Sequence, residues 1–465
     1  MSYALGPLAG LGLYFLMTEW GHPSSASIVA GITVLCALWW ALEPLPIPVT
    51  SLIPLAIFPL LGVLTKEQVA LAFGHHINLL MLGGFALSLA MEKSMAHKGL
   101  AQRLLKWVSG GQAQISGRRV LFGFMAVSAL LSMWISNTAA AIMLLPMAIV
   151  VAKAASKDTE SVLMVPLLLA ICYSASIGGL GTPIGTPPNL IFISVYEAEF
   201  GKEIGFLQWM TWALPVVFCM LMIAFWWLSR TIPREKAIEL VTPQAMNSWQ
   251  IRVLLVFLLT ALGFLFRSEP FGGWQTWLGL PKASDASVAL IAIILMCIVP
   301  RGGKAADKAK PLFEWEFAKD LPWGVLLLFS GGLAIASAFK ASGLSQILAH
   351  TFFSMSSVLP VLATIALIAL VVTFLTELTS NTATASLLMP LLASIAVGSG
   401  IDGMTLMLPA VLSTSFAFMM PVATPPNAVV FGSGLIPIKT MIRYGLVLNF
   451  FGASVVFIYA GFILN

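Results

Sequence analysis

Apolar segments of about 15–22 residues recur from one end of this 465-residue chain to the other. A segment of that length crosses a hydrocarbon layer about 30 Å thick when it is tilted or packed against neighbours. Only 9% of the residues are charged, whereas soluble domains carry roughly 25%. The pattern predicts an all-α polytopic membrane protein. Its first apolar run, residues 5–17, is expected to be a retained helix and not a signal peptide.

The remaining composition excludes several other classes of protein. The polar connections near 230–250 and 300–320 are too short to fold as separate soluble domains. The net charge of +5 does not indicate nucleic-acid binding, because membrane topology explains the positive residues. The four cysteines lie in apolar segments without metal-ligand or disulfide spacing, so we expect packing roles for them. They are Cys36, Cys172, Cys219 and Cys297.

Successive connections between membrane-spanning helices lie alternately on the two faces of the membrane. The positive residues are distributed unevenly between these two sets of connections. One set carries Lys66, Lys202, Arg267, Lys282 and Lys340, and the other carries the remaining 19 of the 24 Lys and Arg residues. Cytoplasmic loops hold the excess of positive charge in membrane proteins. The sequence therefore predicts a protein of the cell inner (plasma) membrane, with a cytoplasmic N-terminus and an external C-terminus.

The triplet Ser-Asn-Thr occurs twice, each time directly before an apolar stretch. The segments "ISNTAAAIMLLP" at 135–146 and "TSNTATASLLMP" at 379–390 share seven of twelve positions. Each lies inside a predicted helical hairpin, at about 119–155 and 353–398, and some hairpin arms are too short to span a bilayer. Such re-entrant backbone is tolerated only inside protein or beside a wet cavity. The charges put the two hairpin bases on opposite membrane faces, so the triplets approach each other from opposite sides.

Further landmarks repeat in the same order in both halves of the chain. The segment at 79–102 resembles the segment at 326–346, including a Gly-Gly pair, and "GTPPN" at 185–189 matches "ATPPN" at 423–427. Because the two halves have opposite predicted orientation, the pattern indicates an inverted-topology repeat. Secondary transporters use this architecture and place their site at the interface of the repeats.

The repeated motifs suit an anion and a cation together. Ser, Asn and Thr cap helix N-termini, and a helix starting at each triplet directs unpaired N–H groups and a positive dipole end beyond its tip. Two such anion seats suit a dicarboxylate. In Thr-Pro-Pro-Asn the prolines break a helix, and the freed oxygens can ligate Na⁺. The motifs contain no Lys or Arg, so the neutralising charge must enter as a carried cation.

Proton coupling fits these motifs less well, because they contain no histidine or acid. The nearest acid is Glu377, four residues before Asn381. It is either a coupling group or a helix-packing or interfacial residue, and we favour the second interpretation. Glu43 and Glu92 lie at the ends of apolar spans, where we expect them to face water.

On these paired motifs the chain resembles the divalent anion:sodium symporter family, especially the bacterial sodium/dicarboxylate symporters, over essentially its whole length. The resemblance implies about 11 transmembrane helices with two re-entrant hairpins, and a homodimer. It also implies that a transport domain slides as an elevator against a scaffold. The implied scaffold with its two interfacial arms covers residues 1–112 and 250–352. The implied transport domain covers 113–230 and 353–465.

The resemblance also implies a set of binding residues. The substrate would contact Asn137, Thr138, Asn381, Thr382, Thr424 and Pro425. One Na⁺ site would use Ser132, Ser136, Asn137 and Gly185. The other would use Thr376, Thr379, Asn381 and Ala423. Thr379 stands where some relatives carry alanine, but the implied ligand there is a backbone carbonyl.

These observations predict a secondary active transporter, and not an enzyme, that imports C4-dicarboxylates such as succinate, malate and fumarate with Na⁺. Its expected partners are the dicarboxylate, the lipid bilayer and a second copy of the chain, without nucleic acid or an organic cofactor. A sodium-independent dicarboxylate exchanger on the same fold is the first alternative. An intramembrane enzyme would need a nucleophile–base pair or metal ligands at membrane depth, and the motifs provide neither. A channel would need a continuous polar helix face.

Overall fold

The computed structural model describes residues 2–108, 114–153, 157–232, 237–239, 245–268, 272–303, 308–356 and 360–463. Regular structure in these residues is almost entirely helical, with one short antiparallel ribbon that pairs β1 (Gln114–Ser116) with β2 (Ala237–Glu239). Eight described helices are long and apolar enough to cross a membrane, and five shorter apolar helices accompany them. The predicted all-α membrane class is therefore confirmed, while the number of about 11 crossings stays a prediction.

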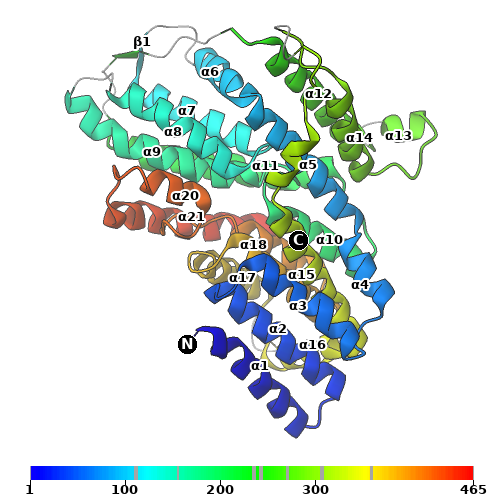
Figure 1. Ribbon diagram of the computed structural model, residues 1–465. Helices are drawn as coiled ribbons and strands as arrows, with labels where there is room; N and C mark the ends of the chain where they lie inside the picture. The colour runs from blue at the N-terminus through cyan, green and yellow to red at the C-terminus, as the bar shows by residue number, and fades with distance from the viewer. Residues whose placement is uncertain are drawn as a thin grey trace.

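One group of helices, here called the framework, is assembled from both halves of the chain. Within it α1 packs on α2, α3 on α15, and α5 on α14. Figure 1 shows α1–α3 at one end of the molecule and α12–α14 toward the other, with α5 running between them. The framework helices are α1 (Ser2–Glu19), α2 (Ser24–Leu42), α3 (Ile47–Leu60), α4 (Lys66–Phe73), α5 (His76–Lys93), α12 (Ser248–Leu265), α13 (Gly273–Trp277), α14 (Asp285–Ile298), the 3-10 turn η1 (Trp315–Asp320) and α15 (Trp323–Ser342).

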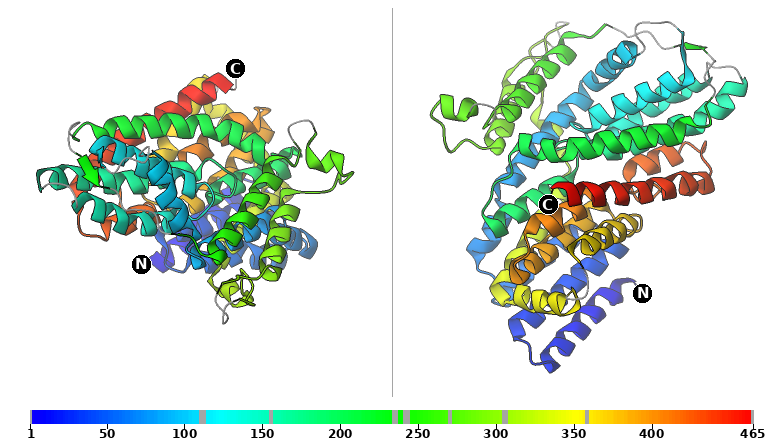
Figure 2. Two further views of the ribbon diagram at one scale, coloured as in Figure 1. Left: turned by 90° about the horizontal axis from the view of Figure 1, so that it is seen from above. Right: turned by 180° about the vertical axis from the view of Figure 1, so that it is seen from behind.

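The second group, here called the motif unit, carries all four sequence motifs. In it α10 packs against α18, and α20 packs against α8 and α9, so each half of the chain contacts the hairpin of the other half. Figure 2 shows α11 (green) and α21 (red) side by side. The helices are α7 (Gly117–Ser132), α8 (Asn137–Lys153), α9 (Lys157–Gly179), α10 (Pro187–Phe200), α11 (Phe206–Ser229), α17 (Val361–Leu375), α18 (Asn381–Ser399), α19 (Gly403–Ser413), α20 (Pro425–Phe431) and α21 (Ile438–Ile463).

Two helices connect the framework to the hairpins. These are α6 (Ala96–Val108), which packs on α7, and α16 (Leu344–Ser356), which packs on α18. The predicted second hairpin would therefore begin with α17 at Val361 and not near residue 353, because Pro360 holds the N-cap position of α17 with non-helical backbone (φ −58°, ψ 149°). The expected boundary at residues 112 and 113 lies outside the described residues.

The second glycine of each Gly-Gly pair lies where the framework meets the motif unit. A Cβ atom added at Gly84 of α5 would stand 3.3 Å from the Cβ of Ile184, which belongs to the broken segment between α9 and α10. A Cβ atom added at Gly332 of α15 would stand 3.5 Å from the Cβ of Ser386 in α18. The absence of a side chain at both positions lets the two helix groups approach closely along this seam.

The first glycine of each pair packs inside the framework instead. Gly83 lies against Ala289 of α14, and Gly331 lies against Ser51 of α3. Adjacent residues of a helix point in different directions. Each Gly-Gly pair therefore allows close packing against a framework helix on one side and against the motif unit on the other. The matched segments of the sequence thus have matched packing roles in the two halves.

Candidate functional site

The four motifs line one cavity of about 980 Å³, although they are far apart in the chain. The hairpin tips contribute 136–138 and 380–382, and the breaks between helices contribute 185–187 and 423–426. Residues of α2, α3, α5 and α15 complete the wall. Of the predicted substrate and ion residues, all but Ser132 and Thr376 line this cavity, and those two are fully buried behind it.

Both triplets start a helix, as the sequence predicts. Helix α8 begins at Asn137, and the Ser136 hydroxyl accepts a hydrogen bond from the Ala139 amide (3.0 Å), which is the predicted N-cap. Helix α18 begins at Asn381 with Ser380 in the N-cap position, but the Ser380 hydroxyl makes no capping bond there. The first N–H groups of a helix have no acceptor within it. Two helix N-termini therefore border the same cavity.

An oxygen-rich cluster lies behind the first triplet. The Ser132 hydroxyl hydrogen-bonds to the Asn137 side-chain carbonyl, and its oxygen is 2.7 Å from the backbone carbonyl of Ala175. A hydroxyl carries a single proton, so only one hydrogen bond can form among the three neighbouring oxygen atoms of Ser132, Asn137 and Ala175. The remaining lone pairs make this a neutral site suited to a hard cation.

The second triplet repeats the same cluster. The Thr376 hydroxyl oxygen lies 2.7 Å from Asn381 Oδ1 and 3.0 Å from the backbone carbonyl of Thr414. Thr376 and Asn381 follow their counterparts in the first half by 244 residues, the same offset as the triplets. The side-chain oxygens of Asn137 and Asn381 are thus engaged by these buried hydroxyls. Each side-chain NH₂ is left as a possible donor to a ligand in the cavity.

The two broken helices are held open by the asparagine of each Thr-Pro-Pro-Asn motif. Asn189 Nδ2 donates to the carbonyl of Gly179 (3.0 Å), the last residue of α9, and to the carbonyl of Thr182 (2.8 Å) within the break. Asn427 Nδ2 does the same in the second break, at two carbonyls 3.0 Å away. Buried polar groups need such partners. Sequence reasoning missed this role, although the repeated asparagine at one offset was a usable signal.

The second break has an additional support in Glu377, which is only 3% exposed. Its Oε1 accepts hydrogen bonds from the amides of Phe418 (2.6 Å) and Met419 (2.8 Å), and its Oε2 accepts from Met420 (2.9 Å). The Asn449 amide donates to Oε1 as well (2.7 Å). Glu377 does not line the cavity. These contacts favour the packing interpretation over the coupling one, since the carboxylate holds the unwound backbone in place.

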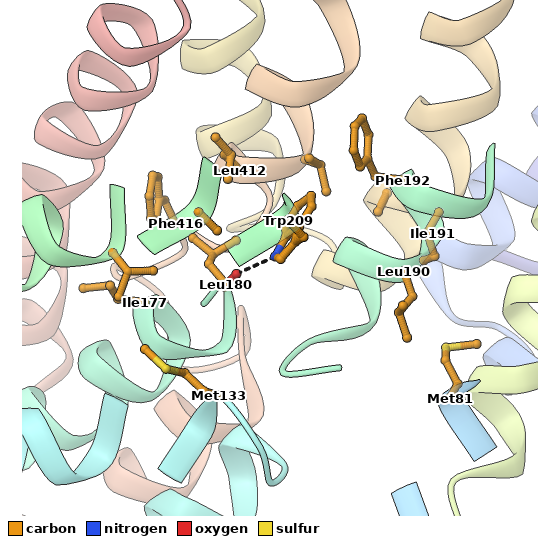
Figure 3. Close-up of a cluster of buried hydrophobic side chains, with 14 of the residues drawn as sticks. Met81, Met133, Ile177, Leu180, Leu190, Ile191, Phe192, Trp209, Leu412 and Phe416 are labelled. Carbon is orange, nitrogen blue, oxygen red and sulfur yellow. Dashed lines mark hydrogen bonds between the residues drawn. The ribbon is translucent and has the colours of Figure 1, made fainter. Parts of the chain in front are cut away.

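The first break is held by different means. The Thr182 hydroxyl donates to the carbonyl of Met133, a residue 244 positions before Glu377. Trp209 of α11 donates from Nε1 to the carbonyl of Leu180 (2.8 Å), within the buried apolar cluster of Figure 3. The unwound backbone is therefore anchored by a hydroxyl and an indole where the second half uses a carboxylate.

Ion pairs join the framework to the motif unit at the end of α5 remote from α6. His76 Nε2 lies 3.3 Å from Glu197 of α10. Arg267 follows α12 and pairs with Glu203, which follows α10, and with Asp285 of α14, at 2.6 Å each. Burial opposes the charge on Arg267, but Asp285 and Glu203 outweigh it and raise its pKa. The contacts of Glu197 and Glu203 link the two groups in the conformation described, whereas the Arg267–Asp285 pair lies within the framework.

A membrane-type helical fold that brings two helix N-termini and two broken helices to one cavity is typical of secondary transporters. In the described residues no cluster of three or more His, Cys, Asp or Glu side chains is placed to hold a metal ion. Residues 37–409 match the family model described as citrate transporter (CitMHS). The chain belongs to the divalent anion:sodium symporter family, and it is a transporter and not an enzyme.

Relatives match nearly the full length of the chain. It is 38% identical to the sodium-dependent dicarboxylate transporter SdcS of Staphylococcus saprophyticus, over 98% of this chain and 91% of that protein. It is 36% identical to SdcS of Staphylococcus aureus strain MRSA252, over 99% and 90% respectively.

Two solved structures share the fold at low identity. The YdaH transporter of Alcanivorax borkumensis aligns with a TM-score of 0.63 and 16% identity, covering 93% of this chain and 98% of that one. MtrF of Neisseria gonorrhoeae aligns with a TM-score of 0.55 and 12% identity, covering 87% and 83%. At such identities the likeness concerns the fold alone.

Proposed function

We propose that this protein imports C4-dicarboxylates such as succinate, malate and fumarate into the cell together with Na⁺. The observation that carries the proposal is the meeting of both Ser-Asn-Thr triplets and both Thr-Pro-Pro-Asn breaks at one cavity without a basic residue in its described lining. Relatives that match nearly the whole chain are named sodium-dependent dicarboxylate transporters, which supports the same substrate and ion.

In this proposal the two helix N-termini bind the two carboxylates of the substrate. Each seat offers unpaired backbone N–H groups, the positive end of a helix dipole and the NH₂ of an asparagine. Hydrogen bonds to a charged group contribute roughly 1.5–3 kcal/mol each, which offsets part of the desolvation of a dianion. The proposed substrate contacts are Asn137, Thr138, Asn381, Thr382, Thr424 and Pro425.

Two Na⁺ ions would occupy the oxygen-rich clusters behind the triplets and neutralise the dianion. The excess of lone pairs over protons at Ser132 and Thr376 supports this placement. The Thr379 hydroxyl is engaged with the Thr384 hydroxyl (2.6 Å), consistent with a backbone carbonyl as ligand there. The first proposed site is Ser132, Ser136, Asn137 and Gly185. The second is Thr376, Thr379, Asn381 and Ala423. Net inward charge movement would require a third ion.

We further propose that the motif unit moves as an elevator against the framework, within a homodimer whose N-termini are cytoplasmic. The packing of α10 against α18, and of α20 against α8 and α9, ties the two halves together and supports a motif unit that moves as one body. The close approach at Gly84 and Gly332 supports sliding, because no framework side chain projects toward the motif unit at these two positions. The helices α6 and α16 would brace the moving unit.

Uptake of radiolabelled succinate into proteoliposomes tests the proposal. We expect accumulation when Na⁺ is high outside and low inside, and almost none when choline replaces Na⁺, because the cavity lacks a resident positive charge for the dianion. Empty vesicles without protein are the control. Transport that requires internal dicarboxylate and ignores Na⁺ would instead identify a sodium-independent exchanger.

A two-seat site also predicts how analogues compete. We expect monocarboxylates such as butyrate to inhibit succinate uptake at least tenfold more weakly than fumarate, because one helix N-terminus would stay unoccupied and its N–H groups unpaired. Inhibition constants measured in one proteoliposome preparation give the comparison. Equal inhibition by butyrate and fumarate would contradict the two-seat arrangement.

A further inference from the structure

We propose that Glu43 sets the charge selectivity and the cation dependence of the cavity. Its carboxylate would act as a fixed negative charge in the cavity wall that weakens anion binding until cations are present. The inference rests on the proposed function, since it concerns how strongly that cavity binds a dicarboxylate and how this binding depends on Na⁺. It adds a framework residue to a proposed set of binding residues that otherwise all belong to the motif unit.

The first observation is the position of Glu43. It follows α2 on the framework side of the cavity and is the only ionisable residue in the described lining. Its side chain is exposed, and among the described residues no hydrogen bond or ion pair holds its carboxylate. The opposing walls carry hydroxyls, amides and helix N-termini, all neutral groups. An unpaired carboxylate in this wall therefore acts on whatever enters the cavity.

The second observation is the backbone of Glu43. Its φ of 46° and ψ of 43° are left-handed, and in the described chain only Met95 shares a positive φ among non-glycine residues. The residue caps α2, with its N–H bonded to the Trp39 carbonyl (3.0 Å), immediately before Pro44. Glycine or asparagine adopts this conformation with less strain. A glutamate held here against its backbone preference points to a use for the carboxylate.

The physical effect follows from charge. A fixed negative charge repels an anion in proportion to the anion's own charge, and it attracts Na⁺ into the same space. Entry of a trianion is therefore disfavoured more than entry of a dianion. Cations that bind first lower the repulsion, so anion binding becomes more dependent on Na⁺. Glu43 and Pro322 both line the cavity next to connections that the charge distribution assigns to the cytoplasm, where repulsion would also favour substrate release.

Binding of succinate and citrate to purified protein tests this inference. Isothermal titration at pH 8, where citrate is a trianion, is carried out at 5 and 100 mM Na⁺, with choline chloride holding the ionic strength constant. We expect Glu43→Gln to bind succinate about three- to tenfold more tightly than wild type at 5 mM Na⁺, with a smaller gain at 100 mM. Its citrate-to-succinate affinity ratio rises by a similar factor. Glu43→Asp keeps the charge and behaves as wild type.

Two controls separate charge from backbone effects. Glu67→Gln removes an exposed acid that pairs with Lys66 (3.8 Å) away from the cavity, and it leaves both affinities unchanged. Glu43→Asn is neutral, so its succinate and citrate affinities should equal those of Glu43→Gln. Because asparagine adopts left-handed backbone more readily, its melting temperature should be at or above that of the wild type. Wild-type affinities in Glu43→Gln and Glu43→Asn would overturn the inference, as would equal weakening by Glu43→Gln and Glu43→Asp. Failure of wild-type protein to bind succinate with Na⁺ would instead refute the proposed function.

Discussion

Asn137→Ala and Asn381→Ala are each expected to abolish Na⁺-driven dicarboxylate uptake while the protein still inserts into the membrane and folds. In the proposed site each asparagine would connect an ion cluster to a substrate seat, because its oxygen contacts the hydroxyl of Ser132 or Thr376 and its NH₂ would remain for the anion. Truncation removes hydrogen bonds to charged groups worth roughly 1.5–3 kcal/mol each, at both ligands. We therefore expect a loss of at least a hundredfold in uptake rate.

Initial rates of succinate uptake into proteoliposomes measure this loss, and size-exclusion profiles with melting temperatures report folding. Asn247→Ser is the matched control, since Asn247 caps α12 outside the cavity and serine keeps the cap. Wild-type uptake by either alanine variant would show that its triplet is not part of the binding site.

A disulfide between Gly332→Cys and Ser386→Cys is expected to stop transport almost completely. The Cβ atoms of these two positions would stand about 3.5 Å apart, as in natural disulfides. The bond would join α15 of the framework to α18 of the motif unit, and a sliding unit cannot move past such a link. We expect less than a tenth of the reduced activity after oxidation, with recovery on addition of dithiothreitol.

Uptake before and after oxidation, in a variant whose four native cysteines are replaced, tests this expectation. Each single cysteine variant under the same oxidant is the control. Succinate binding by the locked protein checks that the site survives, because the cavity residues are not altered. Full uptake by quantitatively cross-linked protein would refute an elevator along this seam.

Helix positions were largely predictable from the sequence because they depend on local properties. Apolar length located the long helices, and the paired prolines marked the breaks that precede Pro187 and Pro425. Capping chemistry predicted a helix start at each triplet, where α8 and α18 begin at Asn137 and Asn381. The short helix α4 and the ribbon of β1 and β2 were not predicted, because segments so short carry a weak periodic signal.

The roles of several polar residues were not predictable, because they depend on contacts between distant parts of the chain. Glu377 has its donors about 41 to 72 residues away, and no local pattern distinguishes it from an acid facing water. Glu43 is exposed, but its place in the cavity wall follows from how α2 packs near the hairpin tips. Likewise Asn189 and Asn427 hold carbonyls that only unwound backbone exposes.

By itself the sequence determined the membrane-type helical class, the repeat and the motif residues, because hydropathy, proline and helix capping act over one or two turns of chain. The charge distribution also predicted that the two triplets approach each other, but only the tertiary structure decided that all four motifs and several framework residues line one cavity. It also decided which oxygen atoms cluster behind Asn137 and Asn381, and which polar groups hold the two breaks open. Those outcomes depend on helix packing across the whole chain. Buried polar groups require hydrogen-bond partners, and packing supplies these partners from residues that are distant in the sequence.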